Sequence, residues 1–320
     1  MTHQVQGLVI FEAPLLKERT SIGLGGPAIA EIRVSSASGL EQVSETAQRL
    51  CGSGGRIAPF GAGTNIIALE PVGQVLPLVL LTQDIWQEIR VMPSVMEGVQ
   101  DRVLLKADAA QKLPALLAKA TSLGLGGLEG LAGIPGSVGG AVAMNAGSYG
   151  VSIGDFVHSV EVFSPVCGLM ELPASDFAFS YRSCRWIGPG APSADDGWFL
   201  ITAVTLALSK NDGRLIRERM AAVYAKKRAS QPVTARSAGC VFKNPAPEHP
   251  AGRLLEQAGL KGMSRGGMRF STVHANFLVN EGTSGGAGAS ADAMYLIELA
   301  KDKVYKESGH ILEREVRVWP

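Results

Sequence analysis

The sequence predicts an α+β protein built from two α+β units and a C-terminal α+β domain. Three observations support this prediction. Short β-branched stretches alternate with a few amphipathic helices, glycine-rich segments separate the elements, and the residue pattern changes after about residue 210. A chain of 320 residues, 46% of them hydrophobic, can bury a sizeable core in two or three domains. We expect the units to span residues 1–72, 73–210 and 211–320.

The overall charge and the cysteine usage argue against several classes of protein. Thirty basic residues balance twenty-nine acidic ones, so no nucleic acid is expected to bind through bulk charge. The longest apolar run, Val75 to Leu81, is too short to span a bilayer, and the first twenty residues carry no secretory pattern. The four cysteines lack a Cys-x-x-Cys pair, which favours a reducing cytoplasm and predicts neither disulfides nor a metal site. We expect a cytoplasmic protein that contacts no membrane and is a monomer or a weak oligomer.

The first predicted unit is a strand, a helix, a strand and a glycine loop. The strand "AEIRV" spans residues 30–34, and Ser38 followed by Glu41 matches a capping box. Apolar residues then recur at helical spacing as far as "GSGG". The second strand, "RIAPF", leads directly into "GAGTN", residues Gly61 to Asn65.

The second predicted unit is mostly antiparallel β-structure with one embedded helix, at Lys112 to Leu123, which Gly124 ends. In the last unit we expect helices at 214–228 and 290–308, a flexible connection at 282–290 and a final strand in "EREVRVW". Strands of the second unit are expected at 76–82, 85–92, 102–107, 159–163, 177–181 and 199–208.

Seven glycines lie in the segment "GLAGIPGSVGGAVAMNAGSYG", Gly130 to Gly150. Glycine permits positive φ and lets backbone amides approach a ligand, and strings of such amides form anion sites suited to a pyrophosphate. The loop "GAGTN" offers a second cradle, although tight turns explain that loop alone equally well. A Rossmann fingerprint fails because the expected helix precedes the glycines. The two segments together predict a dinucleotide held outside a Rossmann frame.

The segment "GLEGLAGIPGSVGGAVAMNAGSYG" resembles the FAD-binding segment of the UDP-N-acetylenolpyruvoylglucosamine reductases. Seven further segments fit the same family in the same order, which makes the resemblance specific from Thr20 to Val318. It implies an FAD-binding fold of the vanillyl-alcohol-oxidase type followed by a C-terminal substrate domain. The seven segments are "TSIGLGGPA", "FGAGTNII", "FSYRSC", "SAGCVFKNP", "AGRLLEQAGLKG", "HANFLVN" and "LEREVRV".

The resemblance implies that NADPH reduces the FAD and that a hydride then passes to C3 of UDP-N-acetylglucosamine-enolpyruvate, a step in peptidoglycan synthesis. Negative charge develops at C2 and in the carboxylate, so the site needs charge-stabilising groups and one acid. FAD-binding residues are expected in the two glycine segments and just after them. They are Gly61, Ala62, Gly63, Thr64, Asn65, Gly133, Ile134, Pro135, Gly136, Ser137, Gly139, Gly140 and Asn145.

Three residues match the catalytic positions of the family. Arg182 and Glu315 are the expected charge-stabilising groups, although either one alone reads as an ordinary surface charge. Cys240 matches the proton donor, and a thiol with the ordinary cysteine pKa of about 8.5 is mostly protonated at neutral pH. Without the resemblance, a lone cysteine reads better as a buried hydrophobe.

Five further residues, named at the end of this paragraph, are expected to contact the substrate. For His274, a structural role explains the residue equally well. The expected substrate contacts are Tyr181, Lys243, Asn244, His274 and Asn276.

The chain lacks one feature of some family members, because no tyrosine-bearing loop lies between Cys184 and Arg236. It therefore matches the shorter subtype of the family, and the residues that contact the uridine are unassigned. The loop "PGAPSADDG" at 189–197 carries no readable motif. The alternatives are an FAD oxidase that reduces oxygen, and a flavin-binding sensor or sugar-nucleotide-binding module without turnover.

Overall fold

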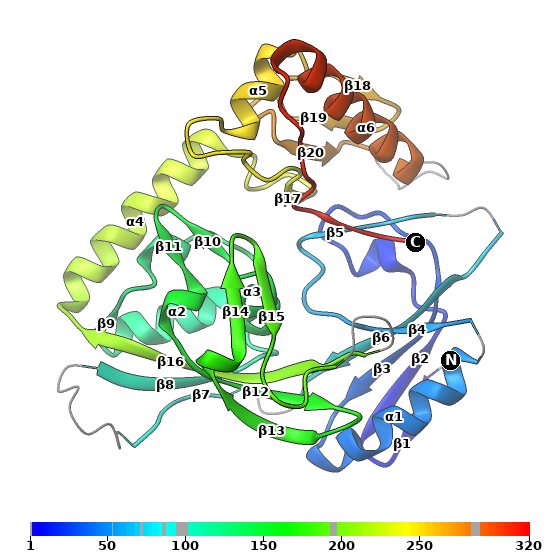
Figure 1. The fold of residues 1–320 in the computed structure, drawn as a ribbon, viewed down its shortest axis with the longest axis vertical. Coiled ribbons are helices and arrows are strands. Elements are labelled where there is room, and N and C mark those ends of the chain that lie inside the picture. The colour runs from blue at the N-terminus through cyan, green and yellow to red at the C-terminus, as the bar shows by residue number, and fades with distance from the viewer. Residues whose placement is uncertain are drawn as a thin grey trace. The chain divides into compact units, whose positions relative to one another are not determined.

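The chain folds into two compact units, each assembled from segments that are distant in sequence (Figure 1). Within the part of the chain that is described, no helix is long and apolar enough to cross a membrane. The first unit comprises Met1–Glu12, Ala30–Gly61 and Val79–Lys226, and the second comprises Ala13–Ile29, Ala62–Leu78 and Lys227–Pro320. The computed structural model describes residues 2–52, 54–70, 73–84, 88–93, 102–192, 197–282 and 289–320.

The expected domain boundaries at residues 72 and 210 stay a prediction. The two compact units are defined by contacts within the chain, and such contacts do not test where the expected domains begin and end. The connections expected at 282–290 and 189–197 lie partly outside the described residues, as does the start of the strand expected at 85–92.

A five-stranded sheet has the strand order β1-β2-β3-β6-β4. Helix α1 (Ala37–Cys51) buries Leu40, Val43 and Ala47, which lie on the apolar stripe expected from the sequence. The capping box expected at Ser38 is wrong, because the helix begins earlier, after the N-cap Ser36. The strands are β1 (Thr2–Val5), β2 (Leu8–Glu12), β3 (Ala28–Val34), β6 (Leu76–Gln83) and β4 (Arg56–Pro59).

A six-stranded sheet forms the centre of the first unit, with the order β13-β12-β16-β8-β7 and β9 paired to β16. All of its printed pairings are antiparallel, which confirms the expected mostly antiparallel unit. Helix α2 (Leu113–Ser122) covers one face, where Leu105, Val160 and Val204 are fully buried. The strands are β13 (Gly168–Pro173), β12 (Val157–Ser164), β16 (Leu200–Lys210), β8 (Arg102–Asp108), β7 (Ile89–Val91) and β9 (Leu125–Gly126).

A second short helix, α3 (Val138–Ala143), begins inside the glycine-rich segment, where the sequence does not predict one. Two glycines at its start give the segment low helix propensity, whereas the Ser137 hydroxyl accepts a hydrogen bond from the Gly140 amide and caps the helix. Smaller elements complete this unit: β10 (Gly147–Ser148), β11 (Val151–Ser152), β14 (Phe177–Ser180), β15 (Ser183–Trp186) and the 3₁₀ turns Glu129–Leu131, Ile153–Phe156 and Ala174–Asp176.

The second unit is built on a four-stranded antiparallel sheet in the order β17-β20-β19-β18. The C-terminal strand β21 (Arg317–Trp319) lies beside β5 (Ile66–Ala68), and the two run parallel (Figure 1). The helix expected at 290–308 is α6 (Ala289–Ser308). The basic helix is α4 (Gly213–Ser230), of which residues up to Lys226 belong to the first unit. The other elements are β17 (Ser237–Cys240), β20 (Phe277–Asn280), β19 (Met268–Phe270), β18 (Ser264–Arg265), α5 (Ala251–Gln257) and the 3₁₀ turn Leu16–Glu18.

Candidate active site

Cys240 is the last residue of β17 and lines a cavity of about 400 Å³ in the second unit. Its side chain is half-buried, and no disulfide involves it. Three of the residues expected at the substrate, Asn244, His274 and Asn276, line the same cavity. The structure therefore brings four predicted residues, two from each of two motifs, around one cavity. Gln231, Arg253 and Glu256 also line it. Arg253 and Glu256 belong to the segment "AGRLLEQAGLKG", which carries the family resemblance but assigns no role to them.

A buried asparagine, Asn276, holds the chain directly after Cys240 in place. Its Oδ1 accepts a hydrogen bond from the Phe242 amide at 3.0 Å, and its Nδ2 donates to the Phe242 carbonyl at 2.8 Å. The Asn276 carbonyl also accepts from the Val241 amide at 2.8 Å. Only 2% of Asn276 is exposed, so these bonds form away from water, where leaving them unmade is costly. These contacts favour a role for Asn276 in positioning Cys240.

Glu315 reaches the same place from the far end of the sequence. Its backbone amide donates to the Val241 carbonyl at 2.8 Å, and the Phe242 and Arg314 backbones form an isolated bridge. Because Val241 directly follows Cys240, the backbone at Glu315 is held one residue away from the thiol-bearing position. The Glu315 side chain is half-buried. The structure thus brings two of the three predicted catalytic residues together.

The loop "GAGTN" is hydrogen-bonded to the segment that carries Glu315. The Asn65 side chain donates to the Glu315 carbonyl at 3.2 Å, and the Asn65 carbonyl accepts from the Arg317 amide at 3.0 Å. The carbonyl of Thr64 lies 4.0 Å from the position that a Cβ on Gly239 would occupy. The predicted FAD loop and the predicted proton donor are therefore neighbours within the second unit.

His274 lies half-buried at the cavity. Its Nδ1 accepts a hydrogen bond from the Asn276 amide at 3.2 Å, and its ring meets Phe277 edge-on. Burial lowers the pKa of His274 below its usual value, while the nearby Glu256 carboxylate acts in the opposite direction. The ring is thus favoured in its neutral form, with one nitrogen occupied by the backbone.

Lys243 and Asn244 are held on the segment that follows the Cys240 strand. The Lys243 ammonium pairs with the Glu313 carboxylate at 3.4 Å, in a largely solvated arrangement. The Asn244 Oδ1 accepts from the Ala251 amide at 2.9 Å, at the start of α5. The carboxamide oxygen of Asn244 therefore already accepts one hydrogen bond from the main chain, while the side chain still lines the cavity.

In the first unit, the two glycine segments meet at Gly61. A Cβ on Gly61 would lie 2.6 Å from the Ser137 hydroxyl and 3.8 Å from the Cα of Gly140. A side chain at residue 61 would thus displace the cap of α3 or block the space next to it. The absence of a side chain at residue 61 leaves this space open, and glycine lets backbone amides approach a ligand closely.

Two amides of the long glycine segment form hydrogen bonds with acceptors in the protein itself. The Gly139 amide donates to the Ala109 carbonyl at 3.0 Å, and the Gly140 amide donates to Ser137. Gly133 and Gly136 have φ values of +81° and +118°, which favour glycine strongly. Among the described residues, no backbone acceptor outside regular elements is seen for these two amides. The stretch 133–137, with Ile134 and Pro135 between the glycines, is part of the segment in which the sequence predicts FAD-binding residues.

Arg182 lies at the tip of the hairpin formed by β14 and β15, with a left-handed φ of +58°. Its guanidinium lies over the Tyr181 ring, 5.0 Å from the centroid. Asn145 supports this tip, since its Nδ2 donates to the Ser180 carbonyl and its Oδ1 accepts from the Gly154 amide, both at 2.9 Å. Asn145 is buried and committed to these two bonds.

Sequence reasoning misses one residue that ties the second unit's loops together. The Ser21 hydroxyl donates to the Ser237 carbonyl at 2.6 Å, and the Ser21 amide donates to the Gly63 carbonyl at 3.1 Å. Ser21 thus links the FAD loop to the start of the Cys240 strand. Its signal lies in "TSIGLGGPA", a segment that carries the family resemblance but assigns no role to its serine.

Two other cysteines are poor candidates for a reactive thiol. Burial raises the pKa of the Cys184 thiol to about 12 and raises the pKa of Cys51, so both are poor nucleophiles. No group of three or more metal-binding side chains occurs within the described ranges.

Comparisons with known proteins assign two parts of the chain to known families. Residues 33–169 match the family model of an FAD binding domain, and residues 231–319 match that of the C-terminal domain of UDP-N-acetylenolpyruvoylglucosamine reductase. The UDP-N-acetylenolpyruvoylglucosamine reductase of Nitratidesulfovibrio vulgaris is 47% identical, over 97% of this chain and 98% of its own. The protein of the same description from Oleidesulfovibrio alaskensis is 45% identical, over 98% of each chain.

One solved structure covers nearly the whole chain. The UDP-N-acetylenolpyruvylglucosamine reductase of Thermus caldophilus superimposes with a TM-score of 0.75 at 32% identity, over 97% of this chain and 98% of its own. Together with the family models, this match confirms the α+β fold with an FAD-binding part and a C-terminal domain that the sequence predicts.

Proposed function

Because the chain belongs to the family of UDP-N-acetylenolpyruvoylglucosamine reductases, we propose that it reduces UDP-N-acetylglucosamine-enolpyruvate to UDP-N-acetylmuramate with NADPH, and that Cys240 supplies the proton that C2 takes up in this reduction. The chain is an oxidoreductase with an FAD-binding domain, and its family makes a precursor of peptidoglycan. FAD, when bound, supplies the hydride chemistry that links NADPH to C3 of the enolpyruvyl ether.

The FAD phosphates are proposed to lie against the glycines at 133–137 and the loop at 61–65. The φ values of Gly133 and Gly136 and the close approach of Gly61 to Ser137 support this placement. Thr64 and Asn65 add side-chain donors in the loop.

Cys240 is proposed to deliver a proton to C2 of the substrate. The thiol lines the cavity that also holds Asn244 and His274, so a bound substrate has polar partners there. A general acid must lie within hydrogen-bonding reach of the carbon that it protonates, and the bonds of Asn276 hold the adjacent backbone rigid. His274 is favoured neutral because burial lowers its pKa, so it leaves the local field without an added positive charge.

Glu315 and Arg182 are proposed to stabilise the negative charge that develops on the substrate carboxylate and C2. A planar guanidinium suits a carboxylate, and a carboxyl group near it shares charge through a hydrogen bond. The observation that carries the proposal is the hydrogen bond between the Glu315 amide and the Val241 carbonyl, which sets Glu315 beside Cys240.

The test is anaerobic stopped flow of the reduced protein mixed with the enolpyruvyl substrate, followed by the return of oxidised flavin absorbance. Cys240→Ala should keep the NADPH half-reaction near normal and slow reoxidation by about 100- to 10,000-fold, the usual contribution of general acid catalysis. Cys240→Ser retains a small protic group and should keep much of the rate. Cys184→Ala, which removes a thiol of raised pKa elsewhere, is the matched control. Normal reoxidation and product formation in Cys240→Ala would exclude this thiol from the mechanism.

A further inference from the structure

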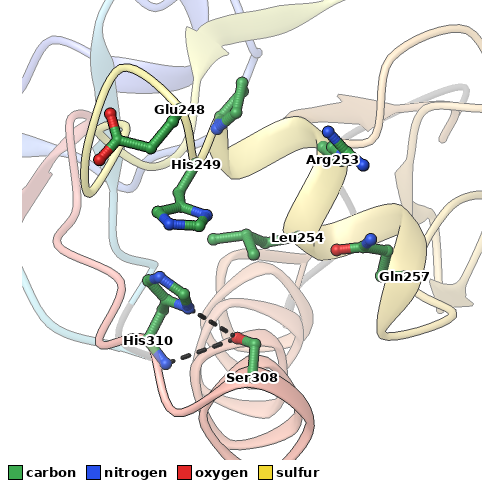
Figure 2. Close-up of a pocket in the computed structure, with 8 residues that line it drawn as sticks. Glu248, His249, Arg253, Leu254, Gln257, Ser308 and His310 are labelled. Atoms are coloured by element: carbon green, nitrogen blue, oxygen red, sulfur yellow. Dashed lines mark hydrogen bonds between the residues drawn. The ribbon is translucent and has the colours of Figure 1, made fainter.

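A second cavity, of about 280 Å³, lies in the same unit (Figure 2). Pro250 and Arg253 line both this cavity and the one that holds Cys240, so the two spaces adjoin. The volume is at the small end of the range for ligand pockets, which suits one chemical group better than a whole cofactor.

Hydrogen-bond donors gather around this second cavity. The rings of His249 and His310 lie 4.4 Å apart between centroids, and Figure 2 shows a ring nitrogen of His310 on the side that faces His249. The Nδ1 of His310 lies 3.2 Å from the Ser308 hydroxyl, which leaves the facing nitrogen for another partner. The amide of Gln257 lines the same space.

The charge around the cavity favours an anion. Arg253 contributes a guanidinium that no carboxylate of the described residues pairs with, and each imidazole offers a ring N–H donor. One carboxylate, Glu248, lines the cavity and opposes them. A dianion that only accepts hydrogen bonds satisfies these groups together, and Arg in particular matches the geometry of a phosphate.

We propose that this cavity binds the 2′-phosphate of NADPH and thereby sets the preference for NADPH over NADH. The inference rests on the proposed function, since it takes NADPH as the hydride donor. A nucleotide that reaches the Cys240 cavity passes Arg253, which both cavities share. The diphosphate of the UDP-sugar has similar chemistry, so the experiment must separate these two sources of phosphate.

Equilibrium binding tests the site without turnover. Adenosine 2′,5′-bisphosphate should bind the FAD-loaded protein at least about tenfold more tightly than 5′-AMP, since hydrogen bonds to a charged group are worth that much or more. His249→Gln and His310→Gln should each remove most of the difference, whereas Glu248→Gln should increase it. His158→Gln, an exposed histidine on β12, is the matched control. Equal binding of both probes by the wild-type protein, or a difference that survives in both histidine variants, would overturn the proposal.

Kinetics then separates the two sources of phosphate. His310→Gln should lower kcat/KM for flavin reduction by NADPH about tenfold and leave reduction by NADH and reoxidation by the enolpyruvyl substrate unchanged. A variant that loses reoxidation and keeps NADPH reduction would assign the cavity to the UDP diphosphate and refute the assignment to NADPH. If neither nicotinamide nucleotide reduces the wild-type protein, the proposed function fails, and the binding comparison still reports on the cavity.

Discussion

At the residue scale, two backbone contacts explain how residues from distant motifs come to share a task. Val241 accepts a hydrogen bond from Glu315, and Phe242 is clamped on both sides by Asn276. Neither contact involves the reactive side chains themselves. The predicted acid and the predicted charge-stabilising carboxylate are thus brought close together by hydrogen bonds to the main chain that directly follows Cys240.

Loss of either charge-stabilising group should separate the two half-reactions. Arg182→Ala and Glu315→Ala should each slow flavin reoxidation by the enolpyruvyl substrate about 100-fold or more, because a preorganised charge partner acts mainly in the transition state. Flavin reduction by NADPH should change little. Stopped-flow traces of both half-reactions provide the measurement, with Arg185→Ala on the same hairpin as the control. Equal losses in both half-reactions would mean that these residues hold the fold or the flavin instead.

The lowered pKa of His274 predicts a pH dependence of stability. Burial disfavours the charged ring, so the unfolded chain binds a proton at a higher pH than the folded chain does. The contribution of His274 is therefore fully present above its unfolded pKa, about 6.5, and is lost as the pH falls below that value. Thermal unfolding at fixed FAD concentration should show a smaller drop between about pH 7.5 and about pH 5.5 for His274→Gln than for the wild-type protein. An unchanged drop would show that other groups dominate.

At the element scale, the glycine segments combine turns with the start of a helix. Helix α3 begins at Val138 although two glycines follow at once, and the Ser137 cap and the bond from Gly139 to Ala109 offset their low propensity. The helix terminus is thereby fixed beside Gly61, where the second glycine segment passes.

A methyl group at this crossing should weaken FAD binding. In Gly61→Ala the new Cβ would lie 2.6 Å from the Ser137 hydroxyl, so the loop or the cap must move. We expect FAD affinity to fall at least about tenfold, a loss of about 1.4 kcal/mol, while the far-ultraviolet circular dichroism stays unchanged. Fluorescence titration of the apoprotein with FAD measures this change. Gly54→Ala, where a Cβ meets nothing within 4 Å, should bind FAD normally; similar affinities in both variants would argue against the cradle.

At the scale of the whole molecule, neither compact unit is a continuous piece of chain. The core of the second unit includes Ile22, Leu24 and Ile67 together with α5, α6 and the four-stranded sheet. Strand β5 also pairs with the C-terminal strand β21. Segments from the first quarter of the sequence therefore complete the hydrophobic core of the last.

This interleaving predicts that the fragment 211–320 does not fold alone. Three fully buried aliphatic side chains would be missing from its core, and each contributes about 1.5–3 kcal/mol. Their sum is comparable with the whole stability of a typical domain. The fragment should show weak circular dichroism and no cooperative thermal transition, whereas the full chain should show both features. A cooperative transition in the fragment would support the predicted boundary at residue 211.

The sequence by itself determined the fold class, most of the helices and strands, and the family, because hydrophobic periodicity and short contiguous motifs are local properties of the chain. Only the tertiary structure decided that the Glu315 amide forms a hydrogen bond with the residue after Cys240. It also decided that the side-chain amides of Asn276 and Asn145 form hydrogen bonds with the main chain, and that α3 begins within the glycine-rich segment. Most of these depend on hydrogen bonds between residues far apart in sequence, which no local pattern encodes. The cavity between His249 and His310 was hidden for the same reason, since its two histidines belong to no shared motif.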